Sequence, residues 1–587
     1  MANGPEQAPP TPPRRPRHQT PVELGFTPAE PVAWLSPVQL AGTGLRVALS
    51  SIQGSYLDKR ELQASFPDQV HAETGPDGDC WVDFVADLGD GFDATYSIAY
   101  LLAQPQLTVG ERVLPRGRVL VLGGDEVYPT PSSDRYEDRL VGPYRAALPM
   151  PPPDGDAPSM YALPGNHDWY DGLTAFQRLF TGTRRSGIGG WRLPQSRSYF
   201  AVELPGNWWL LAVDDQASTY IDDPQLAYFG RVAEGFGPET KVIIASASPT
   251  WVQGADVPQV YESLDYFART VIAPSGAAIR LMVSGDWHHY AHYTGAEREL
   301  ITCGGGGAYL YPTHQLPETI EVPPPPLETT SPREEYRLTS RFPGKRLSQA
   351  YAASIFGRLP KHNPSFIGML GAVHTSMMLA AGAVISSGYG SPIQKFALVP
   401  LFILAAAVVA GTYAFAHLSD SVEGRLRRRM MGLLHGVAQL GLAALGTWAW
   451  WELPLHAWPW PWSLIAALIV YGVLSGLAGT ELVAVYLLFA ARVGVNVNEL
   501  FSAQGIIDSK SFLRFHVAAD GTLTIYPIGV RRVARRWRTN PDGAPHEPWL
   551  EPVGRLHAHL IEDPIVLSPA APVAPSVPSS APETATA

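Results

Sequence analysis

Several features that whole classes of protein require are scarce in this 587-residue sequence. It has only two cysteines, Cys80 and Cys303, and neither lies in a CxxC pair, which excludes a disulfide framework and a cysteine-based zinc site. Positive charge is not in excess, because the net charge is −11, and nucleic-acid-binding proteins usually carry a basic face. The N-terminus has no apolar run as long as a signal peptide requires. We therefore expect reduced thiols, no nucleic-acid partner and no export of the N-terminal half.

The hydrophobic residues that are present are unevenly distributed. A chain of this length is too long for a single hydrophobic core. Residues 1–340 alternate short apolar runs with polar loops, whereas residues 365–492 are almost continuously apolar. The sequence therefore predicts a soluble part followed by a membrane part.

Composition also predicts where these parts begin and end. The N-terminus and the Pro-, Ala- and Ser-rich end cannot bury enough surface to fold. A run containing EVPPPPLETTSPREE at 316–348 reads as a Pro-rich linker or excursion, and the alternating DGTLTIYPIGV predicts a small β-rich unit after the membrane part. The predicted parts are a disordered N-terminus (1–25), an α/β domain (26–345), a linker (346–362), a transmembrane region (363–492), a small cytoplasmic C-terminal segment (493–567) and a disordered tail (568–587).

Short β-rich runs that end in polar residues recur between Trp81 and Ile301. They are WVDFVADLG, RVLVLGGD, MYALPGNHD, WWLLAVDD, KVIIASAS and IRLMVSGDWHH. The stretches 93–104 and 171–180 between them fit helices. This order predicts an α/β domain. Ligands in such domains collect at the carboxyl ends of strands, so the Asp, Asn and His residues that follow the runs are candidate site residues.

Four apolar segments follow the α/β domain, at 366–387, 395–417, 430–451 and 462–490. Each is long enough to cross a hydrocarbon core about 30 Å thick at about 1.5 Å per residue. A buried helical bundle is the alternative, but the scarcity of charges favours membrane spans. The last segment has a second interpretation as two shorter helices broken at Gly479.

Basic residues predict the orientation of these spans. RLRRRM lies between the second and third segments and RRVARRWR follows the fourth, whereas the other two loops carry almost no positive charge. By the positive-inside rule, we expect a multi-pass protein of the cell membrane with the α/β domain and the C-terminus in the cytoplasm. The tryptophans near the third and fourth segments fit an aromatic belt at the outer interface: Trp448, Trp450, Trp451, Trp458, Trp460 and Trp462. Within the spans, we expect His374, His435 and Glu481 to make interhelical hydrogen bonds rather than a transport pathway.

The polar residues at the strand ends match the needs of phosphate-ester cleavage. That reaction requires a hydroxide at neutral pH, neutralisation of the phosphoryl oxygens and a proton for the leaving group, and two metal ions held by Asp, His and Asn supply the first two. The candidates in chain order are Asp87 in ADLGDGF, Asp125 and Tyr128 in LGGDEVY, Asn166, His167 and Asp168 in LPGNHDW, and Asp286 and His288 in SGDWHHY.

With these motifs in this order, residues 80–315 resemble the calcineurin-like metallophosphoesterase superfamily. The family pattern is Asp-x-His or Asp-x-Gly, then Gly-Asp, Gly-Asn-His-Asp/Glu, a lone His and Gly-His-x-His. The Asp-x-Gly and Gly-Asp-x-x-Tyr variants found here are closer to the purple acid phosphatase branch, in which the Tyr can bind iron. The resemblance implies a four-layer α/β/β/α domain, joined here to a C-terminal transmembrane bundle.

The resemblance also implies a role for each matching residue. Asp87 and His288 would bind the first metal ion, with Tyr128 as a further candidate ligand, and Asp125 would bridge both metal ions. Asn166 would bind the second metal ion. By the same resemblance, His167 would stabilise the phosphate or protonate the leaving oxygen, and Asp168 would orient His167.

Two positions depart from the family pattern. The lone His expected after KVIIA is absent, since the strand end reads SASPTW, and Asp286 replaces the first His of Gly-His-x-His. Asp286 can still bind a metal ion through oxygen, and His289, His292 or His314 are alternatives from nearby loops. The first metal site is complete by this pattern and the second is altered. The protein could therefore prefer a different metal, hold a single metal ion or be a degenerate enzyme.

These observations predict a membrane-anchored phosphoesterase that hydrolyses a phosphate mono- or diester with a metal-bound hydroxide. Two metal ions are expected, with Mn, Fe, Zn and Mg not distinguished, and the expected partners are the lipid bilayer and a phosphate-ester substrate, for which a membrane-associated molecule is one option. The alternative is a non-catalytic sensor or scaffold that binds a metal ion or a phosphorylated ligand. The run CGGGGAYLYPTH is not a phosphate loop, because it lacks the Lys-Ser/Thr ending.

Overall fold

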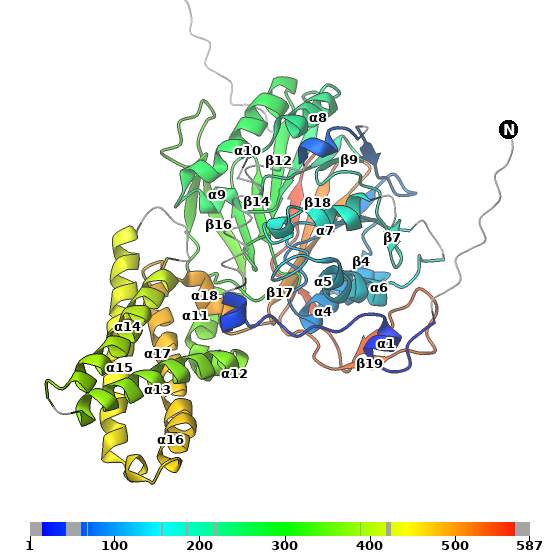
Figure 1. The fold of residues 1–587 in the computed structure, drawn as a ribbon. Coiled ribbons are helices and arrows are strands. Elements are labelled where there is room, and N and C mark those ends of the chain that lie inside the picture. The colour runs from blue at the N-terminus through cyan, green and yellow to red at the C-terminus, as the bar shows by residue number, and fades with distance from the viewer. Residues whose placement is uncertain are drawn as a thin grey trace, which may run out of the picture.

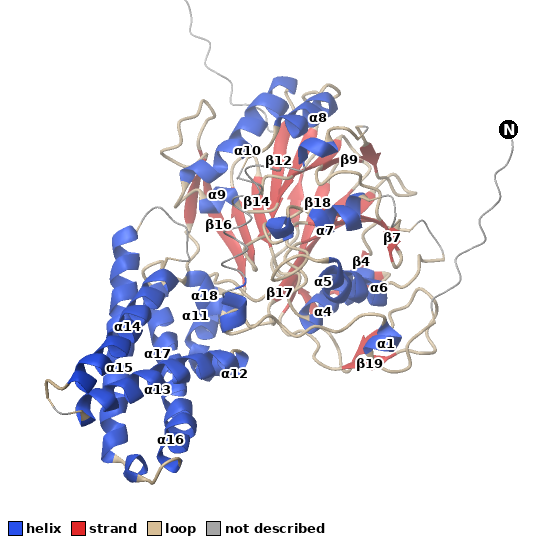
Figure 2. Cartoon of the chain, viewed as in Figure 1, coloured by secondary structure: helices blue, strands red, loops and turns tan. Residues whose placement is uncertain are grey.

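The computed structural model describes residues 14–40, 42, 60–66, 68–153, 157–182, 186–216, 220–387, 389–417 and 424–569. These residues form an α/β body and a bundle of long helices that projects from one side of it (Figures 1 and 2). Two large sheets make up the body.

The first sheet has nine strands, in the order β1 (Val70–Ala72), β9 (Phe200–Leu204), β10 (Trp208–Val213), β11 (Lys241–Ser246), β12 (Ala278–Ser284), β14 (Glu299–Cys303), β13 (Tyr290–Thr294), β16 (Glu334–Phe342) and β15 (Thr319–Val322). The second sheet has the order β21 (Ala558–Leu560), β18 (Leu523–Val530), β17 (Lys510–Val517), β2 (Cys80–Val85), β5 (Val119–Leu122), β6 (Ser159–Ala162), β8 (Trp191–Arg192) and β7 (Gly187–Ile188), and β22 (Ile565–Leu567) also pairs with β18. Two small hairpins join β3 (Gln106–Val109) to β4 (Arg112–Pro115) and β19 (Trp537–Thr539) to β20 (Leu550–Pro552).

The helices of the body are short. They are α1 (Pro21–Leu24), α3 (Arg60–Gln63), α4 (Phe92–Ala103), α5 (Ser133–Tyr136), α6 (Gly142–Ala147), α7 (Thr174–Phe176), α8 (Asp223–Ala233), α9 (Thr250–Gln253) and α10 (Glu262–Phe267). Short 3-10 and π segments adjoin them: η1 (Glu137–Val141), η2 (Asp168–Asp171), η3 (Gln177–Thr181), η4 (Pro258–Tyr261), η5 (Ala268–Ile272) and η6 (Ala273–Ser275).

The central strands of both sheets are buried on both faces. In β11, Ile243 belongs to a cluster shared with strands of the second sheet, whereas Val242 and Ile244 belong to a cluster with helices α8 and α10. In β5, Val121 faces the shared cluster and Leu122 lies in a cluster with helix α4. Successive side chains of a strand point to opposite faces, so this two-sided burial explains the continuous apolar runs.

The helical bundle begins and ends at the body. Its elements are α11 (Lys345–Ala353), α12 (Ile355–His362), α13 (Pro364–Ser386), α14 (Pro392–Phe415), α15 (Arg425–Glu452), η7 (Pro454–Ala457), α16 (Trp462–Ala466), η8 (Ala467–Tyr471), α17 (Gly472–Ala491) and α18 (Val497–Ser502). Four stretches are long and apolar enough to cross a membrane: Pro364–Ser386, Gln394–Phe415, Arg425–Glu452 and Trp462–Ala491. The last is one uninterrupted helical stretch, and Gly479 lies inside α17, so the alternative of a break there is wrong.

These helices leave much apolar surface uncovered. Only 6% of the most apolar window of Gln394–Phe415 is buried, and Phe396 and Phe402 are 81% and 69% exposed. Apolar side chains exposed along a whole helix mark an interaction or membrane surface, so the exposure favours candidate membrane spans over the alternative of a buried bundle. Of the six belt tryptophans, Trp450 differs, because it is buried against Met378 and Tyr471.

The C-terminal segment does not form a unit of its own. Strand β17 pairs antiparallel with β2 over Leu513–Val517, and β18 pairs with β17, so the predicted small β-rich unit extends the second sheet (Figure 1, orange and red strands). Apolar alternation identifies a strand but not the strand it pairs with, which is why the sequence suggested a local unit.

Three further predicted segments also differ from the structure. Strands β15 and β16 lie within the predicted Pro-rich excursion, and α11 and α12 occupy the predicted linker 346–362. Residues 14–25 of the predicted disordered N-terminus are ordered, because Arg15 donates hydrogen bonds to the carbonyl oxygens of Asn540 and Pro548 at 2.8 and 2.6 Å. Residues 1–13 and 570–587 lie outside the described residues.

Candidate functional site

The predicted site residues follow strands whose carboxyl ends lie together. Strands β2, β5 and β6 are adjacent and parallel, and Asp87, Asp125 and Asn166 come shortly after them. Asp286 and His288 follow β12 of the first sheet. The site therefore draws on both sheets.

Three aspartates of this group share an unusual backbone conformation. Asp87, Asp125 and Asp286 have φ angles of 60°, 53° and 65°, in the left-handed region that residues other than glycine rarely adopt. Such residues cost free energy and gather at functional sites, where the surrounding structure imposes them. Two glycines let the backbone pass close to these carboxylates. A Cβ at Gly165 would collide with the Asp125 carboxylate, and a Cβ at Gly304 would collide with the Asp87 carboxylate.

The hydroxyl of Tyr128 is the point where the candidate ligands converge. It donates to Asp87 Oδ1 at 2.9 Å or Asp125 Oδ2 at 3.0 Å and lies 3.0 Å from His288 Nε2. The imidazole of His288 lies 3.5 Å from Asp87 Oδ1. The structure thus places three predicted ligands of the first metal ion around the fourth candidate.

These groups are buried and carry like charges. Burial, together with the charges of Asp125 and Asp286, raises the pKa of Asp87 well above its usual range. Burial and the charges of Asp168 and Asp286 do the same to the pKa of Asp125. Burial also lowers the pKa of His288 well below its usual range. A cation among these groups would favour both the ionised carboxylates and the neutral imidazole.

His167 lies beside this group with a different partner from the predicted one. Its backbone N–H donates to Asp125 Oδ1 at 2.9 Å, and its ring Nδ1 lies 2.8 Å from the carbonyl oxygen of Pro129. Because a carbonyl oxygen only accepts, Nδ1 carries a proton and the neutral ring keeps Nε2 as its acceptor.

Asp168 therefore does not orient the His167 ring through a hydrogen bond in this structure. Its carboxylate accepts from the backbone N–H of Gly165 at 2.9 Å and of Glu126 at 3.3 Å, and from the Tyr136 hydroxyl. Asp168 instead fixes the backbone of the loop that carries Asn166 and His167. A Gly-Asn-His-Asp motif alone does not reveal this, because the acceptor for His167 lies 38 residues away.

At the second metal site that the resemblance implies, Asp286 accepts a hydrogen bond from Gln253 Nε2 at 2.9 Å. None of the alternative histidines is engaged there. His292 lies 2.9 Å from Glu299 Oε2 and 3.1 Å from Glu562 Oε1, and His314 Nδ1 lies 2.8 Å from Ser348 Oγ. His289 is fully buried, with its ring centroid 6.0 Å from those of Trp287 and Tyr311.

Several residues around the site were not predicted. The Trp34 ring lies 5.7 Å from the His167 ring and 5.3 Å from the Tyr309 ring, and Tyr309 lies 4.5 Å from His288. Lys510 on β17 is completely buried, and burial lowers its pKa to about 8. Lys510 comes from the C-terminal segment that the sequence separated from the domain, whereas Trp34 lies within the predicted domain 26–345; no motif marks either residue.

The donor set fits a metal ion in its chemistry. Among the described residues, no three His, Cys, Asp or Glu side chains lie close enough together to hold a metal ion as they stand. Carboxylate, imidazole and phenol groups nevertheless converge here. Asn166 follows the neighbouring strand β6, and within the described part of the chain its buried Oδ1 has no hydrogen-bond partner. Oxygen and imidazole donors of this kind suit Mg, Mn, Zn and Fe.

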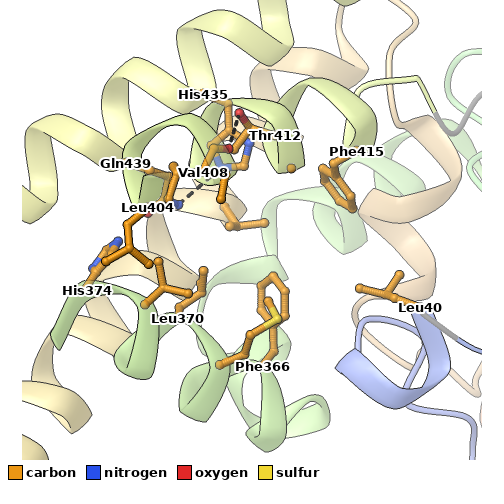
Figure 3. Close-up of a pocket in the computed structure, with 15 residues that line it drawn as sticks. Leu40, Phe366, Leu370, His374, Leu404, Val408, Thr412, Phe415, His435 and Gln439 are labelled. Carbon is orange, nitrogen blue, oxygen red and sulfur yellow. Dashed lines mark hydrogen bonds between the residues drawn. The ribbon is translucent and has the colours of Figure 1, made fainter. Parts of the chain in front are cut away.

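The polar residues of the candidate spans gather at a cavity of about 280 Å³ between α13, α14 and α15 (Figure 3). His374, Thr412, His435 and Gln439 are its polar lining residues, and the rest of the lining is apolar. Gln439 donates to the Gly479 carbonyl at 3.1 Å and lies 3.2 Å from His435 Nε2. Glu481 on α17 accepts a hydrogen bond from the backbone N–H of Gly357 on α12 at 3.1 Å, which is the expected interhelical bond. Between α15 and α17, the hydrogen bond comes from Gln439 and not from a histidine.

Comparison with known proteins finds only distant similarity. No protein-family model matches the chain, and no curated protein matches it. A structure of GAP50, the anchor in the inner membrane complex of Plasmodium, is 11% identical, with 40% of this chain and 74% of that chain covered and a TM-score of 0.29. A structure of PhoD is 9% identical, with 41% and 59% covered and a TM-score of 0.25, so the chain spans somewhat over half of PhoD. At these values neither similarity bears on the function.

Proposed function

We propose that the protein is a membrane-anchored, metal-dependent phosphoesterase that hydrolyses a phosphate mono- or diester. One observation carries this proposal: Asp87 Oδ1, Asp125 Oδ2 and His288 Nε2 all lie within 3.0 Å of the Tyr128 hydroxyl oxygen, although they follow three different strands. A purely structural role would not explain why buried carboxylates with strained backbones gather at one point.

In this proposal, Asp87, Asp125, Tyr128 and His288 hold the first metal ion, and Asp125, Asn166 and Asp286 hold the second. Metal ions bound there would supply a hydroxide at neutral pH and neutralise the phosphoryl oxygens. His167 is the residue that would act on the substrate itself. Its Nδ1–H is fixed by Pro129 O, which leaves Nε2 to accept or deliver a proton at the phosphate. Trp34 packs edge-on against this ring.

The proposal includes the architecture and the topology. A four-layer α/β/β/α order agrees with two sheets that share one cluster and carry helices on their other faces. If the four candidate helices cross the bilayer, the chain returns to the side from which it started, because β17 after them pairs with β2 before them. The basic RLRRRM run supports a cytoplasmic location for that side.

A non-catalytic sensor is the second candidate function. The observation that favours it lies at the proposed second metal site. There Asp286 stands where the family pattern has a histidine, and its carboxylate accepts a hydrogen bond from Gln253. The presence of His167 beside Asp125 favours hydrolysis, because a protein that only binds phosphate has no need of a group that transfers protons there.

The experiment uses the full chain in detergent, because a fragment ending at residue 345 would lack β17 and β18 of the second sheet. Hydrolysis of generic phosphate mono- and diesters is measured with Mn, Fe, Zn or Mg for the wild type, Asp125→Ala and His167→Ala. We expect metal-dependent turnover that both variants lose. Metal binding by the wild type without any turnover would favour the sensor instead.

A further inference from the structure

A hollow begins one residue from the candidate site. Trp287, between Asp286 and His288, lies in the wall of a space of about 420 Å³ together with Tyr311, which stacks on it at a centroid distance of 5.3 Å. Gly494 and Asn498, which follow the last candidate span, form the other side. We name this space the site-side hollow. The Tyr309 hydroxyl donates to Asn498 Oδ1 at 2.7 Å, so the site and α18 are joined directly.

A second hollow of about 410 Å³ continues from the first. Asp256 and Gly494 belong to the walls of both, and Arg427 and Arg428 line the far part. We name this second space the helix-side hollow. The two hollows adjoin at Asp256 and Gly494, and we treat them as one groove between Trp287 and the beginning of α15.

The far end of the groove lies where the candidate spans end. Arg427 is in the first turn of α15, which begins at Arg425, and Gly494 is three residues beyond the end of α17 at Ala491. Both positions adjoin the α/β body, because Asp256 of the body lines the same hollow. If the helices cross a bilayer, this end of the groove lies at the level of the lipid head groups.

The charges of the groove suit a phosphate that arrives from the membrane. Arg427 is exposed, and an exposed guanidinium at the membrane surface binds lipid phosphates through charge-assisted hydrogen bonds. Asp256 carries a negative charge where the two hollows meet, so the anion-binding part of the groove is confined to its membrane end. A water-soluble ester has no need to pass that end.

We propose that the substrate is a membrane phospholipid, whose phosphate is captured at Arg427 and reaches the candidate site through the groove. This inference rests on the proposed function, because it names the substrate of the same site. It assigns Arg427 to capture of the lipid and not to the chemical step.

The test compares each lipid with its water-soluble counterpart, using the metal-loaded full chain in mixed micelles. One pair is dioleoyl phosphatidic acid and glycerol 3-phosphate, and the other is dioleoyl phosphatidylglycerol and glycerophosphoglycerol. For at least one pair, we expect kcat/KM to be at least about tenfold higher for the lipid. Arg427→Glu should lower the lipid-to-soluble ratio of kcat/KM about tenfold, the size of one charge-assisted contact.

Arg425→Glu is the matched control, because Arg425 is exposed at the same helix end but does not line the groove. It should change the ratio less than about twofold. Equal losses in the two variants, no loss in Arg427→Glu, or hydrolysis of the soluble esters without the lipids would overturn the inference and leave the proposed function standing. Hydrolysis of neither member of either pair would overturn both.

Discussion

Arg514 on β17 and Asp83 on β2 form a buried ion pair with two hydrogen bonds, from Nε to Oδ1 at 2.7 Å and from Nη2 to Oδ2 at 2.8 Å. Their side chains are 0% and 2% exposed. The two residues are 431 positions apart and lie on either side of all four candidate spans. The pair therefore fixes the register of the C-terminal strands against the N-terminal domain.

Arg514→Met should destabilise the protein by about 3–5 kcal/mol, because it leaves the Asp83 carboxylate buried and without its charged partner. Thermal unfolding of the detergent-solubilised chain measures the loss. Arg538→Met makes the same change at an exposed pair with Glu551, where the side chains are 69% and 32% exposed, and should cost less than about 1 kcal/mol. Similar losses in both variants would contradict the role of the buried pair.

The contact of His292 with Glu299 and Glu562 predicts a pH dependence of stability. Burial disfavours the charged imidazole, but hydrogen bonds with the two carboxylates outweigh it and raise the pKa of His292 to about 9. The unfolded value is about 6.5. A raised pKa stabilises the fold fully below pH 6.5, and that contribution, on the order of 3 kcal/mol, is lost as the pH rises through 9.

Unfolding is measured between pH 6 and 10 for the wild type and His292→Gln. The stability of the wild type should fall toward pH 9 and above, relative to that of the variant. If the two profiles are parallel, His292 is not charged in the folded protein.

The sequence predicted the residues of the candidate site better than the architecture around it. Asp87, Asp125 and His288 could be singled out because each follows an apolar run. The runs before Asp87 and Asp125 are the neighbouring parallel strands β2 and β5, and the run before His288 is β12 of the other sheet. Lys510 and Trp34 could not, because no local pattern states that β17 pairs with β2 or that a segment near the N-terminus packs on His167. Pairing between distant strands depends on the whole core, which a short window of sequence does not contain.

Tyr128→Phe should destabilise the metal-free protein by about 1–3 kcal/mol, because two buried carboxylates lose their shared hydroxyl donor. Thermal unfolding in the presence of a chelator measures this. Tyr144→Phe is the matched control: Tyr144 is equally buried, and within the described residues its hydroxyl has no hydrogen-bond partner. If the two variants lose the same stability, the hydroxyl of Tyr128 does not stabilise the buried carboxylates.

Gln439→Leu should weaken the contact of α15 with α17, because it removes the hydrogen bond to the Gly479 carbonyl. Such bonds contribute about 0.6–1.7 kcal/mol between helices in a membrane. The unfolding temperature of the full chain in detergent should therefore fall, while hydrolysis at the candidate site is retained. An unchanged unfolding temperature would show that Gln439 does not hold the helices together.

We propose that Asp87, Asp125, Tyr128 and His288 form a metal-dependent catalytic centre. This is tested by the rate of phosphate-ester hydrolysis by the chelator-treated full chain as Mn, Fe, Zn or Mg is added back, beside the Asp125→Ala variant. We expect no hydrolysis without metal, a rate that rises to saturation with at least one metal, and no rise in the variant. Hydrolysis that is independent of metal, or an equal rise in Asp125→Ala, would contradict it.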